Sequence, residues 1–161
     1  MLTTIDVMPD SARLWVYQAS RILNDDEQQL IQQSAQHFID QWAAHGQGLK
    51  ASFMLEDAYF LIIMVDESYA GASGCSIDSS VGLVRKLEQQ LNVSFLDRGV
   101  IAIKNGEEIE LLPLSAVKSS IAEGKITVDT EVYNNSVTSY GEWKASWKQK
   151  ASDSWMGRFF S

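Results

Sequence analysis

The sequence is poor in the residues that cross-link or interrupt a chain: it has one cysteine and two prolines among 161 residues. A single cysteine excludes an internal disulfide and a cysteine-based zinc site. The two histidines, His37 and His45, show no metal-ligand spacing with other candidate ligands. We therefore expect neither a metal nor another cofactor.

Positive charge is also scarce, with 13 Lys and Arg against 21 Asp and Glu and a formal net charge of −8. Nucleic acids and anionic membranes require a dense basic face, so neither is expected as a partner. The longest apolar run, 58–65, is far shorter than the roughly 20 residues that span a bilayer. The N-terminal sequence MLTTIDVMPD lacks the pattern of a secretory signal, so we expect a cytoplasmic protein without membrane insertion.

Four apolar segments predict β-strands, at 13–19, 49–56, 58–66 and 98–104. The second and third are close enough to form a hairpin with its turn at Glu56-Asp57. The third is apolar at nearly every position, which is typical of a central strand.

Two segments predict helices. In 24–46, Asn24 and Glu27 have the spacing of a capping box, and Gly46 is a natural C-terminal stop. After residue 80, apolar residues recur at helical spacing over 81–91. The resulting order of strand, helix, strand, strand, helix, strand predicts an α+β fold with a ferredoxin-like, or split βαβ, sheet of four antiparallel strands and two helices on one face.

The remainder of the chain has a different pattern. Residues 101–135 contain a turn at Asn105-Gly106, a short helix near Ser115 and the segment EGKITVDTEVY. This segment resembles the GYF-type modules of bacteria at Gly124, Lys125, Ile126, Asp129, Thr130, Val132 and Tyr133. The resemblance implies an adaptor that binds proteins, although LLPLS stands where such modules carry Gly-Pro-Phe.

The last residues are rich in aromatic side chains, with Trp143 and Trp147, and Trp155 and Phe159, each four apart. That spacing corresponds to one helical turn, and we expect this tail to pack on the rest of the domain. We predict a ferredoxin-like unit over 1–97 and a GYF-like segment with the aromatic tail over 98–161.

The stretch GASGCSIDSS, residues 71–80, joins an apolar strand to a helix start and is the first candidate site. Backbone amides at a helix N-terminus can hold a small anion. The candidate ligand-binding residues are Gly71, Ser73, Gly74, Ser76, Asp78 and Ser79. The structural alternative, which we favour, is that Ser76 or Asp78 is the helix N-cap.

The same stretch contains Cys75, the single cysteine. The split βαβ order brings the end of the first helix, the end of the third strand and the start of the second helix to one pole. His45, Asp66 and Cys75 lie at these three places. A catalytic triad follows as a hypothesis, with Cys75 as nucleophile, His45 as base and Asp66 as the residue that orients the imidazole.

As a whole, the chain resembles a family of short Bacteroidetes-type bacterial proteins through PDSARLWVYQA, VDESYAGASGCSIDSSV and GKITVDT. Members carry the label of ABC transporter ATPase. A phosphate-binding P-loop needs Gly, four residues, Gly-Lys and Ser or Thr. Gly124-Lys125 has Ser119 in place of the first glycine and is followed by Ile126, so the motifs do not support an ATPase.

The sequence thus favours a non-catalytic binding or adaptor protein, with a functional surface around 71–79. Its partner would be a protein or a small ligand. The alternatives are a cysteine-dependent transferase or hydrolase and a regulatory domain that binds a small anion. An open sheet edge also makes a dimer conceivable.

Overall fold

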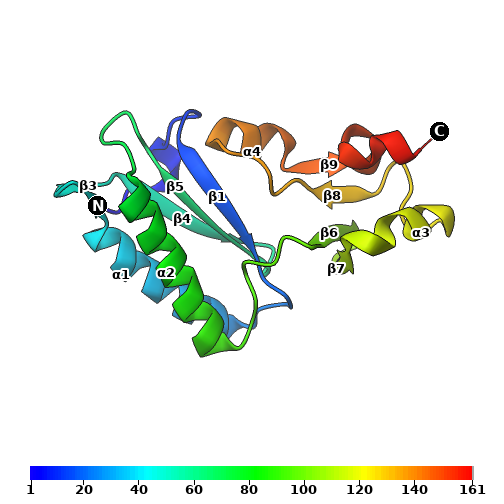
Figure 1. The fold of residues 1–161 in the computed structure, drawn as a ribbon, viewed down its shortest axis with the longest axis horizontal. Helices are drawn as coiled ribbons and strands as arrows, with labels where there is room; N and C mark the ends of the chain where they lie inside the picture. Colours follow the sequence, from blue (N-terminus) through cyan, green and yellow to red (C-terminus); the bar gives the residue numbers. More distant parts are fainter. Residues whose placement is uncertain (161) are drawn as a thin grey trace.

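Two antiparallel sheets organise the α+β fold in the computed structural model, which describes residues 1–160 (Figure 1). The first has the strand order β1-β5-β4, with both neighbours antiparallel to the central β5. Two long helices, α1 and α2, cover one of its faces. The elements of this part are β1 (Arg13–Gln18), α1 (Asp25–Gln41), β4 (Ala51–Glu56), β5 (Phe60–Val65) and α2 (Gly74–Leu91).

Strand β5 is buried on both faces, which explains its uninterrupted apolar sequence. Leu61 and Ile63 belong to the cluster beneath α1 and α2, whereas Ile62 and Met64 face the second sheet. Successive side chains of a strand point to opposite faces, so β5 contributes to two cores at once.

The first helix begins as the sequence predicts. Asn24 and Glu27 form a reciprocal capping box, and acidic residues fill the first turn, where the helix dipole favours them. The hairpin of the second and third strands is also confirmed, although its turn lies one residue later than predicted: Glu56 still pairs with Phe60, and Asp57 and Ala58 have φ of 55° and 60°. Both predictions rest on residues close together in the sequence.

The end of the first helix differs from the prediction. Helix α1 stops at Gln41 rather than at Gly46, and a small hairpin of β2 (Ala43–Ala44) and β3 (Gln47–Gly48) follows. Its turn residues, His45 and Gly46, have φ of 52° and 77°, as the tightest hairpin turns require. His45 is therefore a turn residue and not the last residue of a helix.

The second sheet has the order β7-β6-β8-β9 and lies against the uncovered face of the first. Its elements are β6 (Val100–Asn105), β7 (Glu108–Pro113), α3 (Val117–Ala122), β8 (Glu131–Tyr133), α4 (Tyr140–Ser146) and β9 (Lys148–Lys150). The 3₁₀ turns are η1 (Ile5–Val7), η2 (Leu114–Ala116), η3 (Ala151–Asp153) and η4 (Trp155–Phe159).

The predicted fourth strand of the ferredoxin-like sheet, 98–104, is β6 and belongs to this second sheet, so the first sheet has three strands. Two physical reasons account for the difference. The second face of the first sheet is apolar and requires a cover, and β6 has an adjacent hairpin partner in β7 across Gly106. The edge of β1 contacts the segment at Thr138 instead, whose carbonyl accepts the Leu14 N–H at 3.0 Å.

Aromatic rings fill the space between the two sheets. Trp147 lies 4.9 Å from both Phe60 and Tyr133, measured between ring centroids, and stacks on Trp143 at 5.2 Å. Trp147 is only 2% exposed, so the packing of this part of the tail on the body is confirmed. The two parts share this cluster, and the boundary at residue 97 stays a prediction.

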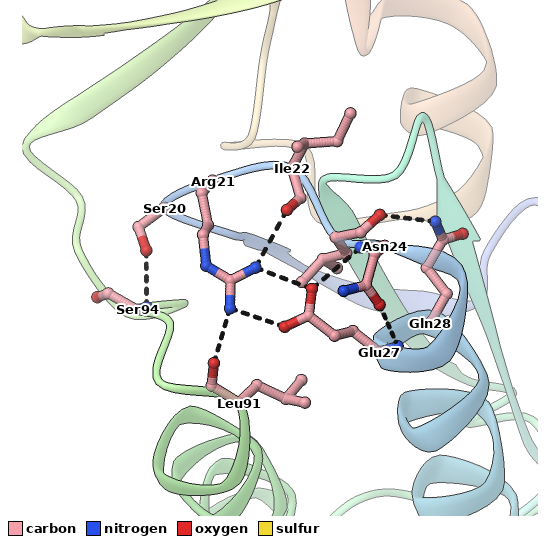
Figure 2. Close-up of polar contacts among 9 residues, drawn as sticks. Ser20, Arg21, Ile22, Asn24, Glu27, Gln28, Leu91 and Ser94 are labelled. Atoms are coloured by element: carbon pink, nitrogen blue, oxygen red, sulfur yellow. Dashed lines mark hydrogen bonds and ion pairs between the residues drawn. The ribbon is translucent and has the colours of Figure 1, made fainter.

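An arginine ties the start of α1 to the end of α2 (Figure 2). Arg21 donates to both carboxylate oxygens of Glu27, at 2.8 and 2.7 Å, and to the Leu91 carbonyl at 2.8 Å. The hydrogen bonds from Arg21, assisted by the Asn24 backbone N–H, lower the pKa of Glu27 to about 2. This network fixes the two helices at the pole opposite to residues 66–73.

Within residues 1–160, no helix combines the length and the apolar character needed to cross a membrane.

Candidate functional site

The candidate loop ends in a capping box at the start of α2. The Ser73 hydroxyl accepts the Ser76 N–H at 3.1 Å, and the Ser76 hydroxyl accepts the Ser73 N–H at 2.7 Å. Ser73 is therefore the N-cap, and the prediction of Ser76 or Asp78 in that role is wrong. Asp78 is exposed one turn further along the helix.

The rest of the loop is closed by a carboxylate. Glu67 Oε2 accepts the Ala72 N–H at 2.9 Å, and Oε1 lies 3.9 Å from Arg13. Gly71 is adjacent, since a Cβ built on it would lie 3.7 Å from the same Glu67 carboxylate. A negative group beside these amides opposes the binding of an anion, and Gly74 simply opens α2.

The three residues of the hypothetical triad have different environments. Cys75 is exposed in the first turn of α2, and His45 is exposed in the turn between β2 and β3. Asp66 is buried after β5 and accepts hydrogen bonds from the Ser68 hydroxyl and N–H, at 2.5 and 3.0 Å. Within residues 1–160, no hydrogen bond joins the carboxylate, the imidazole and the thiol to one another.

Asp66 has a structural role in the loop. The hydrogen bond from the Ser68 hydroxyl lowers the pKa of Asp66, with the Lys50 ammonium 3.8 Å away contributing further. The partners of the Asp66 carboxylate are therefore Ser68 and Lys50. The topology does bring this pole together, because the Trp42 indole N–H donates to the Ser76 carbonyl at 2.8 Å.

A groove runs between α1 and α2 from this pole, with a volume of about 670 Å³. Its floor is apolar and consists of Phe38, Trp42, Leu83 and Leu87. Its rim is polar and includes Ser34, His37, Gln41, Ser79, Lys86 and Gln90. Ser79 is the one predicted site residue that lines it. An apolar floor with a few polar groups around it is the usual composition of a binding site.

One glycine in the middle of α2 widens the groove. A Cβ built on Gly82 would meet no atom within 4 Å, so no close packing in the described structure requires a glycine there. Glycine in a helix interior costs about 0.5–1 kcal/mol relative to alanine. An alanine would therefore fit at position 82, and the glycine leaves additional space in the groove at some cost in helix stability.

The groove carries one lysine and no carboxylate among its lining residues. Its ionisable lining residues are His37 and Lys86, and in the part of the chain that the structure describes neither pairs with a carboxylate. An incoming carboxylate would meet Lys86 at the rim while apolar groups reach the floor.

Sequence reasoning missed most of this site, although part of the signal is visible. Phe38 and Trp42 belong to the apolar stripe of the first helix, and Ser79, Gly82 and Lys86 recur at one face of the second. Neither stripe indicates a groove without knowledge of how the two helices pack. The relation between α1 and α2 is a tertiary feature.

No family model, no curated protein and no solved structure matches the chain. Across residues 1–160, no three or more His, Cys, Asp and Glu side chains are grouped so that they could hold a metal ion.

Proposed function

We propose that the protein is a non-catalytic binding protein of the adaptor type, and that it binds a helix of a partner protein in the groove between α1 and α2. The observation that carries the proposal is the open groove itself, with its apolar floor and the unneeded glycine at position 82. Recognition of an amphipathic helix in an apolar groove is a recurring mode of peptide binding.

The dimensions of the groove support a helical ligand. Its lining residues on α2 extend from Ser79 to Gln90, which is about 16 Å at the helical rise per residue. A ligand helix of about three turns matches this length and would present apolar side chains at i, i+3 or i+4, and i+7. An acidic residue on its flank would face Lys86.

Two substitutions at one position test the proposal. Gly82→Ala is expected to stabilise the protein by about 0.5–1 kcal/mol and to leave the groove usable. Gly82→Trp is expected to fill the groove. Helical peptides of about three turns would be selected from a display library against the wild-type chain. Their affinities would then be measured for both variants by fluorescence anisotropy.

We expect selected peptides to bind the wild type and Gly82→Ala equally and to lose about tenfold or more in affinity for Gly82→Trp, a cost of about 1.4 kcal/mol. Circular dichroism and thermal denaturation would verify that Gly82→Trp is folded. Peptides that bind all three proteins alike, or a library that yields no binder, would refute the groove as the binding site.

The proposal also includes the fold types of the two parts of the chain and the location of the protein in the cell. The order β6, β7, α3, β8 supports the GYF-like identity of residues 101–135, and such modules are adaptors. The strand order β1-β5-β4 with two helices on one face supports a ferredoxin-like origin for residues 1–97, without the fourth strand. We place the protein in the cytoplasm, as the sequence leads us to expect.

A further inference from the structure

A second apolar surface lies on the C-terminal tail. Ile121, Val128, Phe159 and Phe160 line a shallow depression of about 490 Å³, and no polar residue contributes to its lining. Trp155 extends it, since its ring meets Phe159 edge to face with centroids 6.1 Å apart. We refer to these five residues as the tail surface.

Large apolar side chains of the tail surface are in contact with solvent. Val128 is 46% exposed and Trp155 is 45% exposed, whereas the neighbouring Met156 is 1% exposed. The 3₁₀ turn η4 therefore uses one side to anchor itself to the core and presents the other side outward. Ile121, Phe159 and Phe160 are half-buried against the core, so Val128 and Trp155 are the exposed members of the tail surface. Apolar surface left exposed in this way is typical of an interaction site when its members are grouped.

Two cations flank the aromatic centre of the tail surface. The Lys118 ammonium lies 5.3 Å from the Phe159 ring centroid, and the Arg158 guanidinium carbon lies 4.9 Å from it. Within residues 1–160, neither pairs with a carboxylate. Asp129, beside Val128, is compensated by Lys150 at 3.6 Å. The side chains that lie against the Phe159 ring are thus cations without a carboxylate partner in that range. Glu123 and Asp153, two residues from Ile121 and Trp155 in the sequence, form no ion pair within residues 1–160 either.

From this arrangement we infer that the tail surface binds a segment of a partner protein that combines apolar anchors with acidic residues. Apolar side chains would cover Val128 and the exposed edge of Trp155, and carboxylates would pair with Lys118 and Arg158. Aromatic residues and arginine are the residue types enriched at the centres of protein interfaces. A nucleic acid is disfavoured, because the chain carries a net charge of −8.

The tail surface and the groove are far apart. Figure 1 shows α1 and α2 at one end of the longest axis and the C-terminus, beside α3, at the other. Both surfaces can therefore be occupied at once, as an adaptor requires. The tail surface rests on its own residues, and it would stand if the groove bound nothing.

The test is a selection of random peptides of about twelve residues, long enough for about three helical turns or an extended strand. The full chain would be the target, with Val128→Glu and Trp155→Glu as counter-targets. The control is Ile22→Glu, which makes the same kind of change at a residue that is 60% exposed and lies outside the tail surface. We expect binders that are enriched in Asp and Glu together with Leu, Phe or Trp.

These binders should lose about tenfold or more in affinity for Val128→Glu and for Lys118→Glu, while Ile22→Glu and Gly82→Trp bind them normally. Binders enriched in Lys and Arg would overturn the inference, as would the absence of any binder sensitive to Val128→Glu. A concentration-dependent dimer of the wild type that Val128→Glu abolishes would also overturn it, since the occupant would then be a second copy of this chain. Sensitivity to Gly82→Trp alone would support the groove and refute the tail surface.

Discussion

The two faces of the first sheet are covered by different kinds of contact. On the helical face, aliphatic side chains dominate, as with Ile31 and Ile39 of α1 against Leu61 and Ile63 of β5. On the opposite face, Phe60 meets the rings of the second sheet. Aliphatic side chains are held by many weak dispersion contacts, whereas aromatic pairs also have preferred ring angles.

The aromatic face also carries a run of three polar contacts, whereas the polar contacts of the helical face are single ones, such as that of Tyr17 with Ser80. The Trp147 indole N–H donates to Asn135 at 3.0 Å, the Asn135 amide donates to Gln18 at 2.9 Å, and Gln18 donates to the Val100 carbonyl at 3.3 Å. These hydrogen bonds link Trp147, which directly precedes β9, to β1 and β6. The helical face is thus stabilised mainly by apolar packing, and the aromatic face by ring packing together with a run of hydrogen bonds.

The largest expected losses of stability come from one substitution on each face of the first sheet. Trp147→Ala removes the central ring and leaves Asn135 without its donor, and we expect a loss of about 3–5 kcal/mol in the free energy of unfolding. Ile63→Ala on the helical face should cost about 2–5 kcal/mol. Urea denaturation gives both values.

Spectra of the same two variants sharpen the comparison. In ¹H–¹⁵N spectra, we expect Trp147→Ala to broaden the signals of β8 and β9 while those of α1 and α2 stay close to wild type. The matched control is Trp147→Phe, which keeps a ring and should cost less. Equal broadening of both sheets in Trp147→Ala would show that the two faces do not differ in the proposed way.

The second effect concerns the turn between β4 and β5. Asp57 accepts hydrogen bonds from the Tyr133 hydroxyl at 2.9 Å and the Lys148 ammonium at 3.1 Å. Burial alone would raise the pKa of Asp57, but these two hydrogen bonds outweigh it and lower the pKa below its ordinary value. Burial and the bond to Asp57 raise the pKa of Tyr133 in turn.

Asp57→Asn removes the charge and keeps a residue that tolerates the positive φ. Hydrogen bonds to a charged group contribute about 1.5–3 kcal/mol, and we expect a loss of that size near neutral pH. The lowered pKa means that this stabilisation is present above about pH 4 and declines as the pH falls further. Chemical denaturation as a function of pH would show it, and a pH-independent difference would contradict the role of the charge.

A smaller effect of the same sign is expected on the helical side, at Glu27. Its pKa of about 2 in the folded protein lies below the ordinary glutamate value of about 4.3. The Arg21–Glu27 contact therefore stabilises the fold above about pH 4.3, and the stabilisation is lost as the pH falls toward about 2. The melting temperature of Glu27→Gln should lie below that of the wild type near neutral pH, and the two should converge in acid. Parallel curves would refute the assignment.

We expect His45→Ala to have no effect on the reactivity of Cys75, although the triad hypothesis requires one. Cys75 is exposed, so iodoacetamide should alkylate it in the native protein without denaturant. His45→Ala should leave the alkylation rate unchanged, because no hydrogen bond joins His45 to Cys75 within residues 1–160. Mass spectrometry against time measures the rate. A severalfold slower reaction in His45→Ala would restore the enzyme hypothesis.

The features that sequence reasoning predicted correctly depend on neighbours in the chain. The capping box of Asn24 and Glu27 and the turn at Asp57 each involve residues a few positions apart. The interpretation of β5 as a central strand also holds, because burial on both faces removes the alternation of polar and apolar residues.

The features that it missed depend on contacts between distant segments. Sequence reasoning placed the N-cap of the second helix at Ser76 or Asp78, whereas the cap is Ser73, because the first turn, which Trp42 contacts at Ser76, begins earlier in the chain. The sequence of β6 predicts a strand but does not indicate which of the two sheets that strand joins. The groove depends on the distance between two helices, and no local pattern encodes that distance.

The enclosure of β5 has a consequence for the motions of the molecule. Its amides pair with β1 and β4 at both edges, and its side chains Leu61 and Ile62 enter two different cores. Water reaches such amides only through an opening that separates both layers, so their hydrogen exchange reports global unfolding. The helices that bound the groove and the second sheet that supports the tail surface are thus joined to one cooperative strand, and neither end can unfold completely without disturbing the support of the other.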